Sequence, residues 1–126
     1  DSYALIALFR LEKGHEEVTQ LLVDISKGER MGFMSVINLG EIYYITYRKQ
    51  GAEKAELALS SVLQFPIEIV EADFNLTFEA AKLKAKYKIS YADAFAAALT
   101  KSKRGTLITG DKEFKSLEGK IKVKFI

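Results

Sequence analysis

Apolar residues recur three and four positions apart along most of the chain, which is the spacing of amphipathic helices. Shorter apolar or alternating stretches lie between these segments and are typical of strands. The periodicity predicts six helices, at residues 2–13, 16–27, 36–50, 52–65, 75–87 and 90–103. The intervening stretches predict strands at residues 31–34, 67–72, 106–109 and 120–126.

The order of these elements indicates the fold class. Helices alternate with short apolar strands, a succession that favours an α/β layer fold around a mostly parallel sheet. A chain of 126 residues is long enough for one substantial core. Because no internal repeat or linker divides it, we expect a single domain over residues 1–126.

Composition places the chain in a broad class without deciding its function. Hydrophobic residues make up 48% and charged residues 29%, as in an ordinary globular protein. The apolar runs are much shorter than the roughly 18 residues of a membrane span, so we expect a cytoplasmic protein with no membrane partner. A net charge of +2, from 19 basic and 17 acidic residues, permits a nucleic-acid partner but does not require one.

Two absences restrict the chemistry. Cysteine is missing, and His15 is the only histidine. This count argues against Cys/His zinc sites, thiol nucleophiles and triads that contain histidine. If the protein is an enzyme, we expect carboxylates to carry the reaction.

Four acidic residues stand where the local pattern does not require a charge, and Asp93 is the first of them. It shares a helix face with Ile89, Ala96 and Ala97, a surface of small apolar side chains. Asp93 also stands three positions after Ser90, as in a capping box, and an acid in the first turn suits the helix dipole. The local pattern favours neither interpretation over the other.

The other three acids also have structural interpretations. Glu41 interrupts an apolar stripe in the middle of a predicted helix, where an Arg partner from elsewhere in the fold would explain it. Asp111 follows the strand at 106–109 and is suited to cap a short turn. Asp1 begins the first helix and is suited to cap it.

The set of four is more informative than any single member. Ligands of open parallel α/β sheets bind outside the carboxyl ends of the strands, where we expect these acids to converge. Two such charges about 4 Å apart repel by about 4 kcal/mol at an effective dielectric of 20, and a divalent cation removes that cost. Ligands that are all oxygen atoms favour Mg²⁺ or Mn²⁺, and such centres commonly cleave phosphodiesters.

Four segments that contain these acids resemble, in order and spacing, the acidic motifs of PIN-domain ribonucleases, especially VapC-type toxins. The segments are DSYALIALF at 1–9, NLGE at 38–41, YADA at 91–94 and TGDKEF at 109–114. The resemblance covers essentially the whole chain and implies a three-layer α/β/α fold with a central, mostly parallel sheet. The first strand of that fold ends at the first acid, so we expect the sequence to lack a strand upstream of Asp1.

The resemblance also implies an activity and its site. The protein would be a metal-dependent endoribonuclease that hydrolyses single-stranded RNA with Mg²⁺ or Mn²⁺, neutralised by a cognate antitoxin protein and present as a homodimer. Ser2 and Thr109 match hydroxyl positions that support such a site, although a helix cap and an ordinary strand residue explain them equally well. The metal-binding and catalytic residues would be Asp1, Glu41, Asp93 and Asp111.

Two other functions stay open at this stage. One is a non-catalytic module that keeps the fold and binds RNA or a partner protein. The other is a phospho-acceptor receiver domain, which needs an Asp at the end of a middle strand, whereas the strand at 67–72 ends in Val-Glu-Ala. Tyr43, Tyr44 and Tyr47 suit either a core or a partner groove, and Glu113 is a fifth acid to which the pattern assigns no role.

Overall fold

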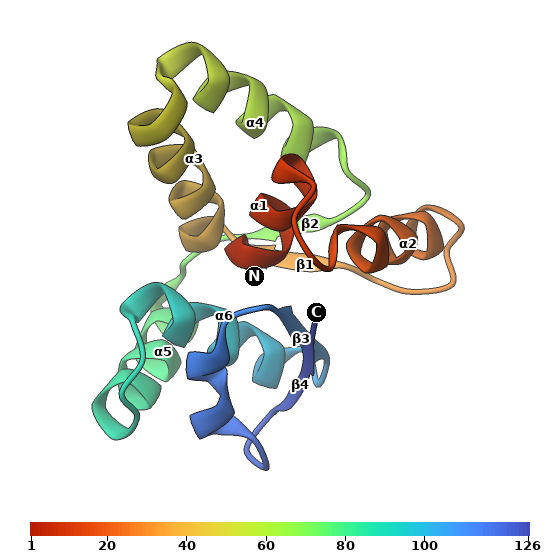
Figure 1. The fold of residues 1–126 in the computed structure, drawn as a ribbon. Coiled ribbons are helices and arrows are strands. Elements are labelled where there is room, and N and C mark those ends of the chain that lie inside the picture. The colour runs from red at the N-terminus through yellow and green to blue at the C-terminus, as the bar shows by residue number, and fades with distance from the viewer.

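The computed structural model describes all 126 residues as helices joined by short strands (Figure 1). The helices are α1 (Ser2–Arg10), α2 (His15–Ser26), α3 (Val36–Gln50), α4 (Ala52–Gln64), α5 (Phe74–Lys86), α6 (Tyr91–Ser102) and the short 3₁₀ helix η1 (Lys112–Leu117). The strands are β1 (Phe33–Ser35), β2 (Glu68–Val70), β3 (Thr106–Thr109) and β4 (Lys122–Phe125). Every predicted helix and strand is present, with ends within three residues of the prediction.

Side-chain caps fix where several helices begin. The Ser35 hydroxyl accepts a hydrogen bond from the Ile37 N–H at 3.1 Å, which confirms the predicted start of α3. Asp73 caps α5 in the same way, a role that the apolar periodicity did not indicate. Helix α1 ends three residues earlier than predicted because Leu11 adopts a left-handed backbone conformation, with φ of 53°.

All strand pairs are parallel, as predicted, but they form two sheets instead of one. Strand β1 pairs with β2 and β3 pairs with β4, with Met34 opposite Ile69 and Leu107 opposite Val123. No strand joins β1 to β3, so the expected central sheet is present as two separate halves. Helix α6 packs against both β1 and β3 and thereby connects the halves.

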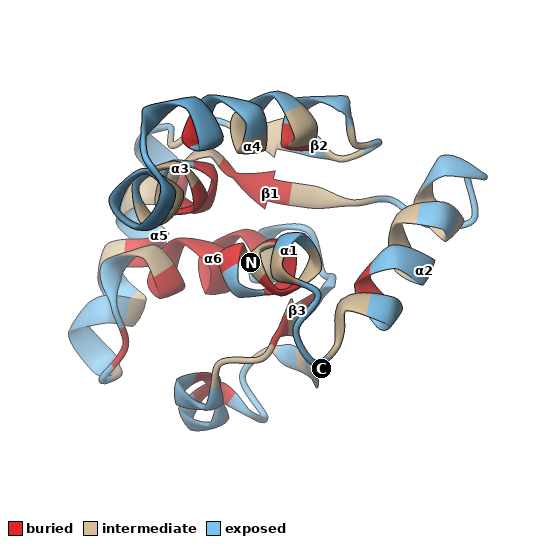
Figure 2. Cartoon of the chain, turned by 45° about the horizontal axis from the view of Figure 1, so that its top comes forward, coloured by how far each residue is buried: buried red, intermediate tan, exposed pale blue.

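Two clusters of buried side chains form the core. One lies around α5, α6, β3 and η1, and the other lies around α1, β1, α3 and α4. Helix α6 is the most completely buried element, and every residue from Asp93 to Leu99 is buried (Figure 2). Its alanines let neighbouring elements approach closely, which explains the run of small residues in the sequence.

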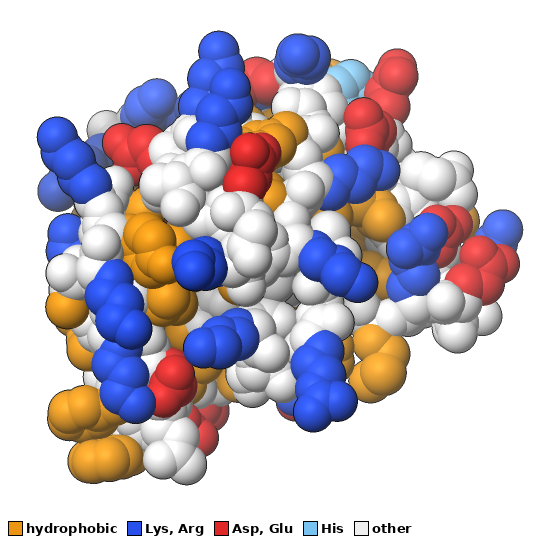
Figure 3. All heavy atoms as spheres, turned by 90° about the horizontal axis from the view of Figure 1, so that it is seen from below, with side chains coloured by type: hydrophobic (Ala, Val, Ile, Leu, Met, Phe, Trp, Pro, Cys, Tyr) orange, Lys and Arg blue, Asp and Glu red, His pale blue; other side chains and the backbone are white.

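The surface is strongly charged. Lys and Arg side chains are spread over the face in Figure 3, interspersed with acidic ones, and do not merge into one continuous basic patch. Lys122 and Lys124 project from the edge strand β4, and the Lys124 ammonium lies 3.1 Å from the Glu17 carboxylate. None of the helices combines the length and the apolar character needed to cross a membrane.

Candidate metal centre

The carboxyl end of β3 and the beginnings of α1 and α6 position three of the four predicted acids. Asp1 is the N-cap residue of α1, Asp93 lies in the first turn of α6, and Asp111 follows β3 directly. Glu41 lies near the second turn of α3, a helix that packs against both α1 and α6. The contacts among these elements bring residues from both ends of the chain to one region.

Asp93, Asp111 and Glu113 form the tightest acidic group. Each of the three offers a carboxylate oxygen, and these oxygens lie within 4.8 Å of one another. The Asp111 carboxylate accepts a hydrogen bond from the Glu113 N–H at 2.9 Å, which begins η1 and fixes the two acids side by side. Asp93 is buried and Glu113 is exposed, so the group is open to solvent on one side.

The environment of Asp93 disfavours its charged form. The pKa of the Asp93 carboxyl is raised from 3.8 to about 6, chiefly by burial and to a smaller extent by the charges of Asp111, Glu41 and Glu113. Hydrogen bonding with Ser90 acts in the opposite direction but does not offset burial. Ser90 accepts the Asp93 N–H at 3.1 Å, so Ser90 caps α6 while the Asp93 carboxylate lies beside Asp111 and Glu113.

This raised pKa predicts how stability depends on pH when no metal is present. The folded protein binds a proton at Asp93 more tightly than the unfolded chain does, so the resulting stabilisation is complete below about pH 4 and is lost as pH rises through about 6. Urea unfolding in EDTA between pH 4 and pH 7 should show the free energy of unfolding falling across this window. The Asp93→Asn variant should show a flatter profile, and identical slopes for both proteins would contradict this environment for Asp93.

Asp1 is held by a hydroxyl that also contacts the Asp111 backbone. The Thr109 hydroxyl donates to Asp1 Oδ2 at 2.6 Å and accepts the Asp111 N–H at 3.0 Å. The other oxygen of Asp1 accepts the Ala4 N–H at 3.1 Å, so Asp1 also caps α1.

Glu41 is bound by neutral side chains and has no Arg partner. Its Oε1 atom accepts hydrogen bonds from the Ser2 hydroxyl at 2.6 Å and from the Asn38 amide at 3.2 Å. The same Asn38 amide donates to the Ala92 carbonyl at 3.1 Å, which connects α3 to the start of α6. The ion pair considered for Glu41 is therefore absent.

The structure gives a place to two residues whose roles the sequence left open. Glu113, the fifth acid to which the pattern assigned no role, belongs to the tightest acidic group. Asn38 is almost fully buried and holds Glu41, and its only signal was a polar side chain one helical turn before that acid. Asp1 and Glu41 are not among the carboxylates that lie within 4.8 Å of one another. Thr109 connects Asp1 to the Asp111 backbone, and the charge of Glu41 contributes to the raised pKa of Asp93.

The donor set suits a hard divalent cation. All the candidate ligands are carboxylate oxygens, and no neighbouring Lys or Arg forms an ion pair with Asp93, Asp111 or Glu113. Several carboxylates at this spacing without a counter-ion repel one another, and this repulsion adds to burial in raising the pKa of Asp93. Oxygen donors of this kind bind Mg²⁺, Mn²⁺ or Ca²⁺ in preference to softer metals.

Comparison with known families gives one match in sequence. The family described as PIN domain matches residues 1–120. That range includes every acidic residue discussed above, from Asp1 to Glu113. No curated protein sequence matches the chain.

Comparison with solved structures shows a common fold at low sequence identity. VapBC2 from Rickettsia felis, bound to a DNA fragment of its promoter, matches with a TM-score of 0.74 and 17% identity, over 99% of this chain and 95% of that one. VapC20 of Mycobacterium tuberculosis, a toxin that cleaves the sarcin-ricin loop, matches with a TM-score of 0.69 and 17% identity, over 91% of this chain and 89% of that one. A toxin–antitoxin complex from Klebsiella pneumoniae matches with a TM-score of 0.66 and 24% identity, over 98% of this chain and 92% of that one. At these identities the likeness establishes the fold alone.

Proposed function

The chain belongs to the PIN domain family, and from that premise we propose that it is a metal-dependent endoribonuclease that hydrolyses phosphodiester bonds of single-stranded RNA. The observation that carries the proposal is the group formed by Asp93, Asp111 and Glu113, whose carboxylate oxygens lie within 4.8 Å of one another. Such a group is costly to maintain without a cation, and it lies at the carboxyl end of β3, where ligands of parallel sheets bind.

The acids divide into those that would hold the cation and those that support them. Asp93, Asp111 and Glu113 would bind Mg²⁺ or Mn²⁺ directly. Asp1 and Glu41, kept in place by Thr109 and by Ser2 with Asn38, would contribute negative charge and further ligands at the margin. A bound divalent cation lowers the pKa of a water molecule and stabilises charge on the scissile phosphate.

The direct test is RNA cleavage by the purified protein. We expect hydrolysis of a labelled single-stranded oligoribonucleotide in millimolar Mg²⁺ or Mn²⁺ and none in EDTA. Cleavage that persists in EDTA would contradict the metal-dependent mechanism. Metal-insensitive RNA binding without cleavage would contradict the enzymatic proposal and favour a non-catalytic RNA-binding module with the same fold.

Metal binding should also be visible in thermal stability. A cation at about ten times its dissociation constant stabilises the folded state by about 1.4 kcal/mol, or about 3–6 °C in Tm for a domain of this size. We expect 10 mM Mg²⁺ or Mn²⁺ to raise Tm by about that amount over a KCl control of equal ionic strength. The Asp93→Asn variant should lose most of this shift, and an equal shift in both proteins would place the metal elsewhere.

We further propose that the protein acts as a toxin, with an antitoxin protein as partner, and that it forms a homodimer. Solved complexes of VapB with VapC from Rickettsia felis and Salmonella typhimurium share the fold, which supports an antitoxin partner here. Tyr44 and Tyr47 of α3 are exposed and available to a partner, whereas the Tyr43 hydroxyl donates to Glu56 within the fold. For the dimer, we expect analytical ultracentrifugation to give a molecular mass of twice the 14.1 kDa of one chain.

A further inference from the structure

One oxygen atom of Glu41 joins two helices. Its Oε1 atom accepts the Ser2 hydroxyl of α1 at 2.6 Å and the Asn38 amide of α3 at 3.2 Å. Ser2 directly follows Asp1, so this contact ties the acid that caps α1 to the acid on α3. Both donors are neutral, and no Lys or Arg forms an ion pair with Glu41. The Glu41 carboxylate is therefore oriented by hydroxyl and amide donors.

The Asn38 amide extends this connection to a third helix. Its nitrogen also donates to the Ala92 carbonyl of α6 at 3.1 Å, across 54 positions of the sequence. Both neighbours of the nitrogen are acceptors, and an Asn amide carries two hydrogens, so each hydrogen serves one acceptor. Ala92 directly precedes Asp93. A single NH₂ group thus links the Glu41 carboxylate to the backbone that carries Asp93.

The position of Asn38 leaves its amide little freedom. Only 1% of the residue is exposed, so water has little access to the amide, and the two hydrogen bonds satisfy the nitrogen. Asn38 lies one helical turn before Glu41, which brings the two side chains to the same face of α3. The amide is therefore held in one orientation between α3 and α6.

The second carboxylate oxygen of Glu41 takes no part in these contacts. Both hydrogen bonds end on Oε1, and no buried side-chain oxygen lacks a partner, so Oε2 reaches the surface of the fold. Burial is the main cause of the raised pKa of the Asp93 carboxyl, and the Glu41 charge adds to it, so the two carboxylates lie within electrostatic range. Oε1 is thus fixed within the protein, and Oε2 is the oxygen that Glu41 can offer to a cation.

We propose that Asn38 is a positioning residue of the metal centre, an assignment that rests on the metal-dependent function proposed above. Asn38 anchors Glu41 to the backbone that carries Asp93 and so sets the separation of the two carboxylates. A neutral amide suits this role, because it orients a carboxylate without pairing with its charge, as an Arg would do. Residues that orient metal ligands typically contribute about 10- to 100-fold to metal affinity.

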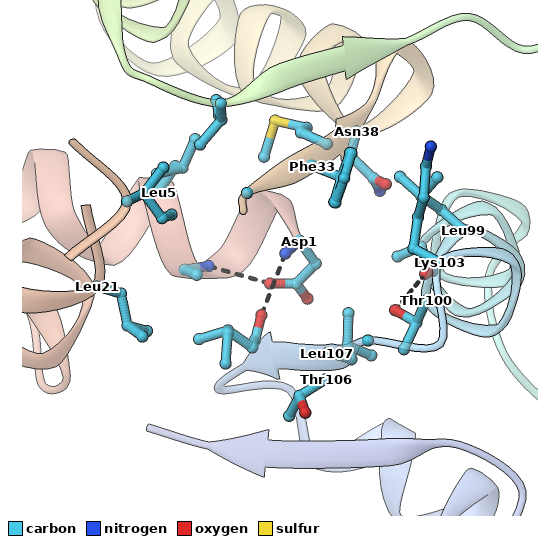
Figure 4. A pocket seen from close by; sticks show the side chains of 18 of the residues that line it. Asp1, Leu5, Leu21, Phe33, Asn38, Leu99, Thr100, Lys103, Thr106 and Leu107 are labelled. Carbon is cyan, nitrogen blue, oxygen red and sulfur yellow. Dashed lines mark hydrogen bonds between the residues drawn. The ribbon is translucent and has the colours of Figure 1, made fainter. Parts of the chain in front are cut away.

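Asn38→Leu removes both hydrogen bonds and keeps the approximate size of the side chain. Asn38 and Asp1 line a cavity of about 470 Å³ with a mainly hydrophobic wall, which leaves room for the branched end of Leu (Figure 4). We expect the variant to bind Mn²⁺ about 10- to 100-fold more weakly than the unmodified protein does. Electron paramagnetic resonance of free Mn²⁺ measures this affinity without RNA, so the result does not depend on nuclease activity.

Val62→Ala is the control for a general loss of stability. Val62 is completely buried on α4, a helix that carries none of the acids assigned to the metal centre. Its truncation should lower Tm in EDTA by several degrees and leave the Mn²⁺ dissociation constant within 2-fold. A similar loss of Mn²⁺ affinity in both variants would overturn the role of Asn38, because weaker binding would then follow from lower stability alone.

A second measurement shows whether Asn38 acts through Glu41. In a Glu41→Gln background the carboxylate that Asn38 positions is gone, so Asn38→Leu should weaken Mn²⁺ binding by less than about 3-fold further. A purely structural role in joining α3 to α6 predicts that Asn38→Leu weakens Mn²⁺ binding by the same factor in both backgrounds. That additive result would overturn the proposed role.

RNA cleavage gives a corresponding kinetic result. For Asn38→Leu, the Mn²⁺ concentration that gives half of the maximal rate should rise by about 10- to 100-fold. At saturating Mn²⁺, KM for RNA should stay within 3-fold, because the buried amide does not reach the substrate. A higher KM with an unchanged Mn²⁺ requirement would contradict a role in the metal centre.

The outcomes separate the role of Asn38 from the proposed function. Undiminished Mn²⁺ binding by Asn38→Leu, together with metal-dependent cleavage by the unmodified protein, would overturn the role of Asn38 alone. An unmodified protein that does not bind Mn²⁺ would overturn both the metal centre and this role. Mn²⁺ binding without cleavage of RNA would overturn the ribonuclease function, and the affinities of the variants would still decide the role of Asn38.

Discussion

Asp93→Asn is expected to reduce RNA cleavage by about 10³-fold and to make the metal-free protein more stable at pH 7. The loss of activity follows from the proposed metal centre, because the substitution removes one of the three clustered carboxylates that would hold the cation, leaving Asp111 and Glu113. The gain in stability follows because Asn is similar in size and carries no charge, whereas ionised Asp93 is buried among three other acids. A substitution that lowers activity and raises stability is typical of a functional residue and not of a structural one.

Cleavage rates in Mg²⁺ and Tm in EDTA measure the two effects separately. Asp73→Asn is the matched control, because Asp73 caps α5 through the Leu76 N–H and Asn caps helices equally well. This control should retain both activity and Tm. Undiminished cleavage by Asp93→Asn would show that Asp93 is not a catalytic ligand.

Phe114→Ala is expected to cost about 3–5 kcal/mol of folding free energy, which is a large part of the total for a domain of this size. Phe114 is completely buried and belongs to the core cluster around α6. It lies on η1 directly after Glu113, so its packing holds the turn that carries two of the three clustered acids. Activity should therefore fall even at temperatures where the variant is still folded.

Urea unfolding monitored by circular dichroism measures this cost. Phe78→Ala removes the same side chain from an exposed position on α5, where 52% of the residue is accessible, and should cost less than about 1 kcal/mol. A similar small loss for both variants would mean that η1 is not anchored as the structure has it.

The sequence was sufficient to locate the elements, because local signals determine where they begin and end. Ser35 and Gly51 bound α3, and the apolar run at 106–109 coincides with β3. The apolar periodicity could not predict which strands pair, because it indicates whether a strand is buried and not which strand lies beside it. The division into two sheets therefore emerged only from the structure.

The candidate site could be predicted as a set of acids but not as a geometry. Asp93 and Asp111 were identified because each departs from its local pattern, and the structure places their carboxylates together. Glu113 was noted as a fifth acid, but the sequence assigned it no role, because only the fold shows that the turn after β3 brings its carboxylate beside Asp93. The support of Glu41 by Ser2 and Asn38, in place of an Arg, depends on a contact across 39 residues that no local pattern reports.

The hydroxyl of Thr109 connects residues from the two ends of the chain, since it bonds to Asp1 and to the Asp111 backbone. A site assembled over such a sequence separation forms late in folding, after the nonlocal contacts have closed. During synthesis the β3 segment and the turn that follows it leave the ribosome among the last residues of the domain. For the proposed ribonuclease, this order means that the nascent chain cannot complete its metal centre until β3 and the turn with Asp111 have emerged.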